Sequence, residues 1–145
     1  VVSMLKYLMN AKNPYDVLYE NPKNKQMHKR FKEINDKYKR ILEKVTFSSE
    51  FFKDVLFFTY GGEMSMSGDI SNEVSYLYPS KKVLIGYRNG SKINISGRGD
   101  NIREKILPIL KEIPGSSGGG HRDAIGASIP LDSVDFFKEK LKELD

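Results

Sequence analysis

The residues of this chain best suited to chemistry lie in a glycine-rich stretch near the C-terminus. Gly118, Gly119 and Gly120 follow one another and are followed at once by His121 and Arg122. Such a run is costly in a helix or strand, so it indicates a loop where a ligand approaches the main chain or φ is positive. Exposed backbone N–H groups beside an imidazole and a guanidinium can cradle a phosphate. A tight surface turn would explain the glycines equally well.

A second candidate is Ser96-Gly97-Arg98-Gly99, which we expect at the end of a strand. Two glycines expose the backbone around one arginine, whose guanidinium can bind a phosphate or carboxylate through two hydrogen bonds. An ordinary surface ion pair with the neighbouring Asp100 is the alternative. Tyr60 and Tyr87 are candidates for stacking on nucleic-acid bases.

Other kinds of site find no support in the sequence. There are no cysteines and only two histidines, His28 and His121, far apart and outside any metal-ligand spacing, and no nucleophile triad is visible. We assign His28 no role beyond solvation. Without an apolar run of about 20 residues or a signal peptide, we expect a cytoplasmic protein. Because the chain does not begin with Met, we expect it to be a piece of a longer protein.

The positive charge is concentrated in the first third of the chain. Of 24 Lys and Arg against 19 Asp and Glu, residues 1–45 contain 11 against 5, and residues 46–145 contain 13 against 14. This basic excess can attract a polyanion, or it can simply solvate a helix face. The candidates for a nucleic-acid track are Lys29, Arg30, Lys37 and Arg40.

Hydrophobic periodicity predicts a helical N-terminal segment. The longest helix should begin at Asn21-Pro22 and carry an apolar seam with spacings typical of heptads. The seam needs a partner, which could be this domain, another domain or another chain. Its residues are Met27, Phe31, Ile34, Tyr38, Ile41 and Val45.

The rest of the chain alternates strand and helix patterns. A strand is predicted at 55–60, then a helix whose apolar face contains Ile70, Val74 and Leu77. Strands at 82–87 and 92–96 flank a hairpin turn, and a helix at 101–113 should kink or end early at Pro108. After the glycine loop, a strand at 125–129 and a helix at 133–144, capped by Asp132, complete the order. This pattern predicts an α/β fold, a compact mixed sheet flanked by helices, with a basic helical connector at 1–48 and the domain proper at 49–145.

The pairing of Ser96-Gly97-Arg98-Gly99 with the glycines, histidine and Arg122-Asp123-Ala124-Ile125-Gly126 resembles the DHH-associated domain. This domain is the C-terminal half of DHH-superfamily phosphoesterases, which include RecJ-type exonucleases, nano-RNases and phosphatases of small nucleotides. The resemblance covers roughly residues 55–144. It implies an α/β domain that faces a catalytic half, on which Mn or Mg performs hydrolysis.

The resemblance also implies roles for single residues. Gly118, Gly119, Gly120 and His121 would hold a terminal phosphate, and Arg98 would contact phosphate or nucleotide, with Ser96 and Arg122 beside them.

Some positions depart from the family pattern. Ser117 stands where many relatives have a further glycine, and Gly99 where many have serine. The Asp and His motifs that bind the catalytic metals are missing, so this chain should bind substrate without cutting it. A related glycine-rich domain of alanyl-tRNA synthetases lacks the histidine, which argues against that assignment.

Three functions therefore remain open. The first is the substrate-binding domain of a RecJ-like exonuclease acting on single-stranded nucleic acid. The second is a non-catalytic module that docks onto a replication or repair protein. The third is the substrate-binding half of a small-nucleotide phosphatase or nano-RNase.

Overall fold

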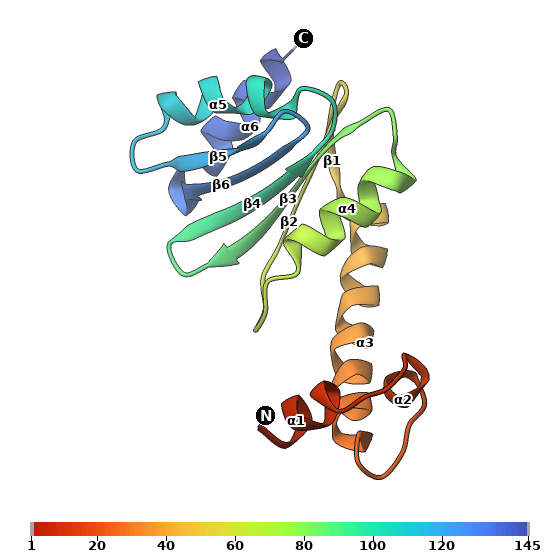
Figure 1. The fold of residues 1–145 in the computed structure, drawn as a ribbon. Coiled ribbons are helices and arrows are strands. Elements are labelled where there is room, and N and C mark those ends of the chain that lie inside the picture. The colour runs from red at the N-terminus through yellow and green to blue at the C-terminus, as the bar shows by residue number, and fades with distance from the viewer. Residues whose placement is uncertain (1, 145) are drawn as a thin grey trace. The chain divides into compact units, whose positions relative to one another are not determined.

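The structure, a computed structural model, describes residues 2–144 and divides the chain into two compact units, 1–40 and 41–145. Both helices and strands are present, and the strands form one mixed sheet, so the predicted α/β class is confirmed (Figure 1). None of the described helices is long and apolar enough to span a membrane.

The first unit consists of three helical pieces: α1 (Val2–Met9), α2 (Tyr15–Leu18) and the beginning of α3 (Lys25–Ser48). The fully buried Asn24 organises the turn before α3, because its amide donates to the carbonyl oxygen of Tyr19 at 2.9 Å. The predicted helix start at Asn21-Pro22 is therefore early, since these residues form that turn. The Nε2 atom of His28 lies 2.9 Å from the carbonyl oxygen of Val17, so this histidine is tied down rather than merely solvated.

The second unit is built on six strands in the order β1-β2-β3-β4-β6-β5. The pair β2–β3 is parallel, and every other neighbouring pair is antiparallel. The first strand was not predicted, because three residues give too little periodicity. The strands are β1 (Glu50–Phe52), β2 (Val55–Tyr60), β3 (Lys82–Asn89), β4 (Lys92–Arg98), β5 (Ser117–His121) and β6 (Ala124–Pro130).

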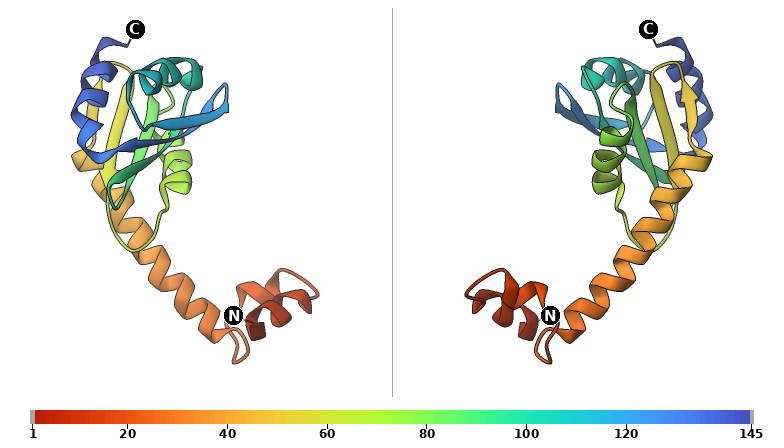
Figure 2. Two further views of the ribbon diagram at one scale, coloured as in Figure 1. Left: turned by 90° about the vertical axis from the view of Figure 1, so that its left-hand side faces the viewer. Right: turned by 90° about the vertical axis from the view of Figure 1, so that its right-hand side faces the viewer.

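Helices cover the two faces of this sheet unequally. On one face lie α5 (Ile102–Glu112) and α6 (Val134–Glu143), which share the main hydrophobic core with the strands. The other face carries α4 (Ser67–Leu77), which packs against β3 and β4 (Figures 1 and 2). The β6–β5 end of that face has no helix among the described residues.

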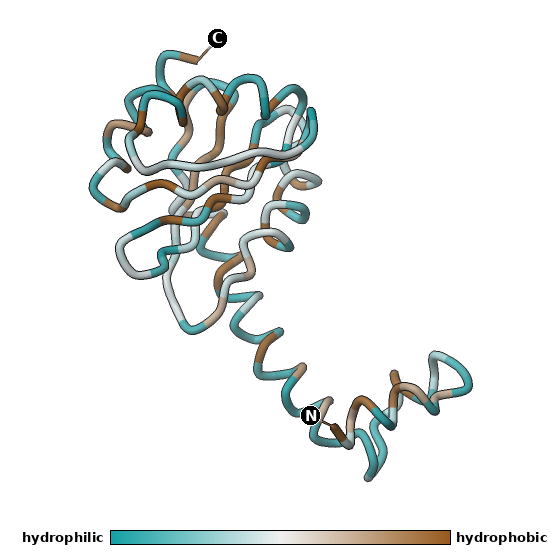
Figure 3. Tube along the Cα trace, turned by 60° about the vertical axis from the view of Figure 1, so that its left-hand side comes forward, coloured by the Kyte–Doolittle hydropathy of each residue, from teal (hydrophilic) through white to brown (hydrophobic). Residues whose placement is uncertain are grey.

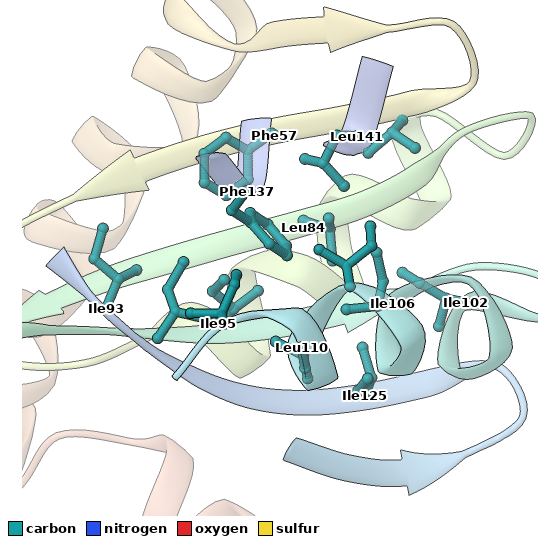
Figure 4. Packing of buried hydrophobic residues seen from close by; sticks show 14 residues of the cluster. Phe57, Leu84, Ile93, Ile95, Ile102, Ile106, Leu110, Ile125, Phe137 and Leu141 are labelled. Carbon is teal, nitrogen blue, oxygen red and sulfur yellow. The ribbon is translucent and has the colours of Figure 1, made fainter. Parts of the chain in front are cut away.

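The core follows from the alternation of side chains along the strands. Residues such as Ile93, Ile95 and Ile125 point to the α5–α6 face and are almost fully buried (Figure 4). Phe57 of β2 meets Phe137 of α6 edge to face, with ring centroids 5.8 Å apart. Hydrophobic segments accordingly gather in the sheet and its helices (Figure 3).

Three local expectations are wrong. The glycine run is not a loop, because Ser117–His121 is the edge strand β5. Of the two outcomes expected at Pro108, the early end is wrong, since α5 continues to Glu112; the missing N–H frees one carbonyl on an exposed side of the helix, where water can satisfy it. Asp132 does not cap α6 but belongs to a short 3₁₀ turn, Leu131–Ser133.

Phe137→Ala should lower the free energy of unfolding by about 3–5 kcal/mol, because it removes a fully buried ring. The neighbouring Phe136 is 43% exposed and is the matched control, with an expected loss below about 1 kcal/mol. Urea unfolding followed by circular dichroism measures both. Equal losses would mean that α6 does not dock on the sheet through this face.

Candidate functional site

The predicted site residues are brought together by the register of three neighbouring strands. Arg98 of β4 pairs with Ala124 of β6, which pairs with His121 of β5. Residues directly opposite each other in a sheet point to the same face, and strands lie about 4.8 Å apart. Arg98 and His121 therefore project from one face, with Cα atoms about 10 Å apart by this spacing.

The next row on the same face has almost no side chains. Ser96 pairs with Gly126, which pairs with Gly119. Both glycines are exposed, and a Cβ atom added to Gly119 would have no heavy atom within 4 Å. The backbone of this row is consequently open to a ligand that the arginine and the histidine of the neighbouring row hold.

The other two glycines of the run have structural reasons to be glycine. They lie on the face of the sheet that α5 covers. A Cβ atom on Gly118 would lie 2.5 Å from the side chain of Leu110, a residue of α5. A Cβ atom on Gly120 would lie 2.2 Å from the carbonyl oxygen of Ala124, and the φ of Gly120 is +154°. Of the three glycines, only Gly119 lies on the same side of the sheet as Arg98 and His121. This is the side that also carries α4, and we call its uncovered part over β4, β6 and β5 the open face.

The guanidinium of Arg98 is held in place by the protein and still has donors to spare. Its Nε atom donates to Oδ1 of Asn72 on α4 at 2.6 Å, and Nη1 donates to the carbonyl oxygen of Gly97 at 2.7 Å. A guanidinium has five N–H groups, so these two bonds leave three for a ligand. The predicted alternative, an ion pair with Asp100, does not form; Asp100 pairs with Arg122 instead.

His121 is exposed, and its ring has no hydrogen-bond partner within residues 2–144. Between it and α4, Ser96 is linked to the start of the helix, because its Oγ atom lies 3.0 Å from Oγ of Ser67. Ser67 in turn lies 3.3 Å from Oγ of Ser65. The open face is therefore lined by hydroxyls on its α4 side and by an imidazole on its β5 side.

Arg122 is bound to side chains near the start of α5. Its guanidinium donates to Asp100 at 2.6 Å and to Oδ1 of Asn101 at 2.8 Å. Asp123, also in the β5–β6 turn, accepts from the backbone N–H of Asn101 at 3.0 Å. These bonds tie the hairpin turn that follows His121 to the start of α5.

The two tyrosines proposed for stacking are engaged in the fold. Tyr60 is 7% exposed, its hydroxyl oxygen accepts from the N–H of Met66 at 2.6 Å, and burial raises the pKa of that hydroxyl. Tyr87 is half-buried against Tyr60 and donates to the carbonyl oxygen of Gly62. Tyr60 is thus unavailable as a stacking surface, and Tyr87 presents at most part of its ring.

The basic positions of α3 are mixed with acids. At 100° per residue, Lys29, Lys37 and Arg40 fall on one side of the helix, but so do Glu33 and Asp36. Arg30 is paired with Glu33 at 3.0 Å. This side of α3 is an alternating surface rather than a uniformly positive one.

Two contributors to the site carry no signal in the sequence. Asn72 and Ser67 lie within an amphipathic helical pattern, and only the packing of α4 against β4 brings them to Arg98 and Ser96. The assembled groups are hydrogen-bond donors around bare backbone, which suits an oxyanion. In residues 2–144, no three histidine, aspartate or glutamate side chains group as a metal site.

The family follows from a comparison with family models. Residues 53–144 match the model of the DHHA1 domain. The chain belongs to this family. The predicted resemblance to the DHH-associated domain is thereby confirmed. A search of curated proteins found no match to this DHHA1 chain.

Solved structures share the fold at low sequence identity. RecJ in complex with Mg²⁺ from Thermus thermophilus superposes with a TM-score of 0.71 over 98% of this chain, at 12% identity. The pGpG-specific phosphodiesterase PggH from Vibrio cholerae gives 0.60 over 98%, at 14% identity. An exopolyphosphatase-related protein from Bacteroides fragilis gives 0.54 over 72%, at 16% identity. This DHHA1 chain covers 22%, 48% and 34% of those proteins, respectively.

Gly120→Ala should cost roughly 1–3 kcal/mol of stability, because the methyl group would meet fixed backbone at a positive φ. Gly119→Ala, on the open face, should leave stability within about 0.5 kcal/mol of the parent. Chemical denaturation distinguishes the two. A Gly119→Ala variant as unstable as Gly120→Ala would mean that the face beside Gly119 is filled.

Proposed function

We propose that this DHHA1 domain binds the terminal phosphate of a nucleic-acid substrate for a DHH-family phosphoesterase. The observation that carries the proposal is the shared face of Arg98, Gly119 and His121. The arginine supplies charge, the glycine supplies bare backbone, and the histidine supplies a further donor. The three spare N–H groups of the tethered arginine suit the several oxygens of a phosphate.

The contribution of these residues is positioning and charge neutralisation. Fixed donors around the phosphate would hold a neighbouring phosphodiester bond in a defined place for attack. Because Asn72 and Gly97 already orient the guanidinium, little entropy remains to be lost when the phosphate binds. The hydrolysis itself belongs to metals on another domain; the described residues of this chain offer no donor set for them.

The likeness to RecJ and PggH motivates the substrate class. RecJ superposes best among these structures, and a RecJ-like single-strand exonuclease is the parent enzyme that we favour. PggH is a pGpG-specific phosphodiesterase, which keeps a short-oligonucleotide enzyme as the second candidate. Phosphate contacts carry no base information, so we expect little sequence specificity.

Arg98→Ala and His121→Ala should each weaken binding of a terminally phosphorylated single strand, by roughly 10- to 100-fold for the arginine, since a charged hydrogen-bond donor is lost. Titration of labelled oligonucleotides followed by fluorescence anisotropy measures this, with and without a 5′- or 3′-phosphate. Arg88→Ala is the matched control. Arg88 is an exposed arginine of β3 paired with Ile93, whose side chain lies in the α5–α6 core, so it belongs to the opposite face.

The expected pattern is a preference for phosphorylated ends that both variants abolish and the control retains. Equal affinity of the parent chain for phosphorylated and unphosphorylated ends would contradict the proposal. That result would instead favour a module that docks onto a protein.

Gly119→Val should also weaken phosphate binding, by about tenfold or more, although the strand remains folded. The isopropyl group would stand in the bare row beside Arg98 and His121, where a ligand must approach the backbone. The same titration measures the loss, and circular dichroism checks the fold. Undiminished binding by a folded Gly119→Val variant would show that the phosphate does not contact this row.

A further inference from the structure

We propose that the open face continues beyond the phosphate site as a track for several nucleotides, ending at Lys92. This inference rests on the proposed function and names the substrate class more closely. The ligand would be a single strand whose terminal phosphate lies at Arg98 and His121 and whose following nucleotides lie along β4.

The track follows from the alternation of residues along β4. Arg98, Ser96, Asn94 and Lys92 are spaced by two, so all four project from the same face. At about 3.3 Å per residue, Arg98 and Lys92 are roughly 20 Å apart. The strand therefore presents a cation, a hydroxyl, an amide and a second cation in a straight line.

The strand beside this line, β6, carries only short side chains next to it. On β6, the partners of the four residues are Ala124, Gly126, Ser128 and Pro130, and none carries a long side chain. Beyond them, β5 contributes Ser117, which pairs with Ser128. An extended strand can lie across β6 and β5 on this face without displacing bulky groups, while α4, which packs on the same face against β3 and β4, bounds the surface at that edge.

The far end of the track is a shallow pocket of about 440 Å³. It is shaped by the ends of β4 and β6, which are held together by the bond from the N–H of Leu131 to the carbonyl oxygen of Ser91 at 2.8 Å. Lys92 is exposed there and has no hydrogen bond or ion pair within residues 2–144. The lining residues are Ser91, Lys92, Pro130, Leu131 and Asp132.

Lys92 and Asp132 give this pocket two kinds of partner. The ammonium of Lys92 suits a backbone phosphate, whereas the carboxylate of Asp132 repels phosphate and accepts from sugar hydroxyls or base amino groups. A mononucleotide bound at Arg98 and His121 is too short to reach either group across roughly 20 Å. Affinity should consequently rise with the length of the strand.

The basic side of α3 is the competing explanation for any gain with length. Its cations alternate with Glu33 and Asp36, so its field is partly cancelled. The polar line on β4 contains no acid, and the acid that lies near its end, Asp132, belongs to the turn after β6. We therefore assign the length dependence to β4 and test the two surfaces against each other.

The experiment titrates the whole chain with terminally phosphorylated oligonucleotides of one, two, four and eight nucleotides. For the parent, the dissociation constant should fall as the strand lengthens. Lys92→Ala should weaken binding of the longest strands about tenfold and leave the mononucleotide unaffected, because only long strands reach the pocket. In Lys92→Ala, the slope of log affinity against log salt concentration should become shallower by about 0.7 for the long strands, because one phosphate contact is lost.

Two matched variants serve as controls. Lys111→Ala removes an exposed lysine from α5, on the other face of the sheet, and should change nothing. Lys29→Ala tests α3 and should weaken binding of the longest strands less than Lys92→Ala does. A gain with length that survives Lys92→Ala but disappears in Lys29→Ala would overturn the track.

Affinity that does not rise beyond a mononucleotide would also overturn the track, and would favour a small-nucleotide enzyme. In that case, weaker binding of the mononucleotide by Arg98→Ala would still support the proposed phosphate site. Failure of the phosphate site itself is recognised separately, because the parent would then bind phosphorylated and unphosphorylated strands equally.

Discussion

The open face depends on the way in which Gly97 is packed. A Cβ atom at this position would lie 2.6 Å from Ile125, 2.9 Å from Leu84 and 3.0 Å from Ile102, so three core side chains occupy the space that a side chain would need. β4 cannot slip by one residue without pushing Ser96 or Arg98 into this core. Burial on one face thus fixes which polar groups appear on the other.

The two arginines near the site have different kinds of partner, which their sequence context did not reveal. Arg98 is held by an amide and a carbonyl oxygen, neither of which neutralises its charge, and it therefore remains attractive to an anion. Arg122 is paired with carboxylates and serves the turn before α5. The two arginines thus differ in the charge of their partners.

The fold was largely predictable because most elements have strong periodic or turn signals. The buried run Val55–Tyr60, the hairpin at Asn89-Gly90 and the amphipathic helix around Phe137 each match their patterns. The predictions failed where a local sequence preference competes with pairing or packing against neighbouring elements. The glycine run became a strand because β6 supplies a partner and α5 leaves room only for glycine at position 118.

The sequence by itself determined which groups this protein offers: a glycine run beside a histidine and an arginine between glycines. Only the tertiary structure decided which of these groups lie on the same face. Pairing across β4, β6 and β5 placed Arg98, Gly119 and His121 on one face and turned Gly118 and Gly120 to the other. The physical reason is that alternation along a strand is local, whereas register is set by core packing between residues far apart in the chain.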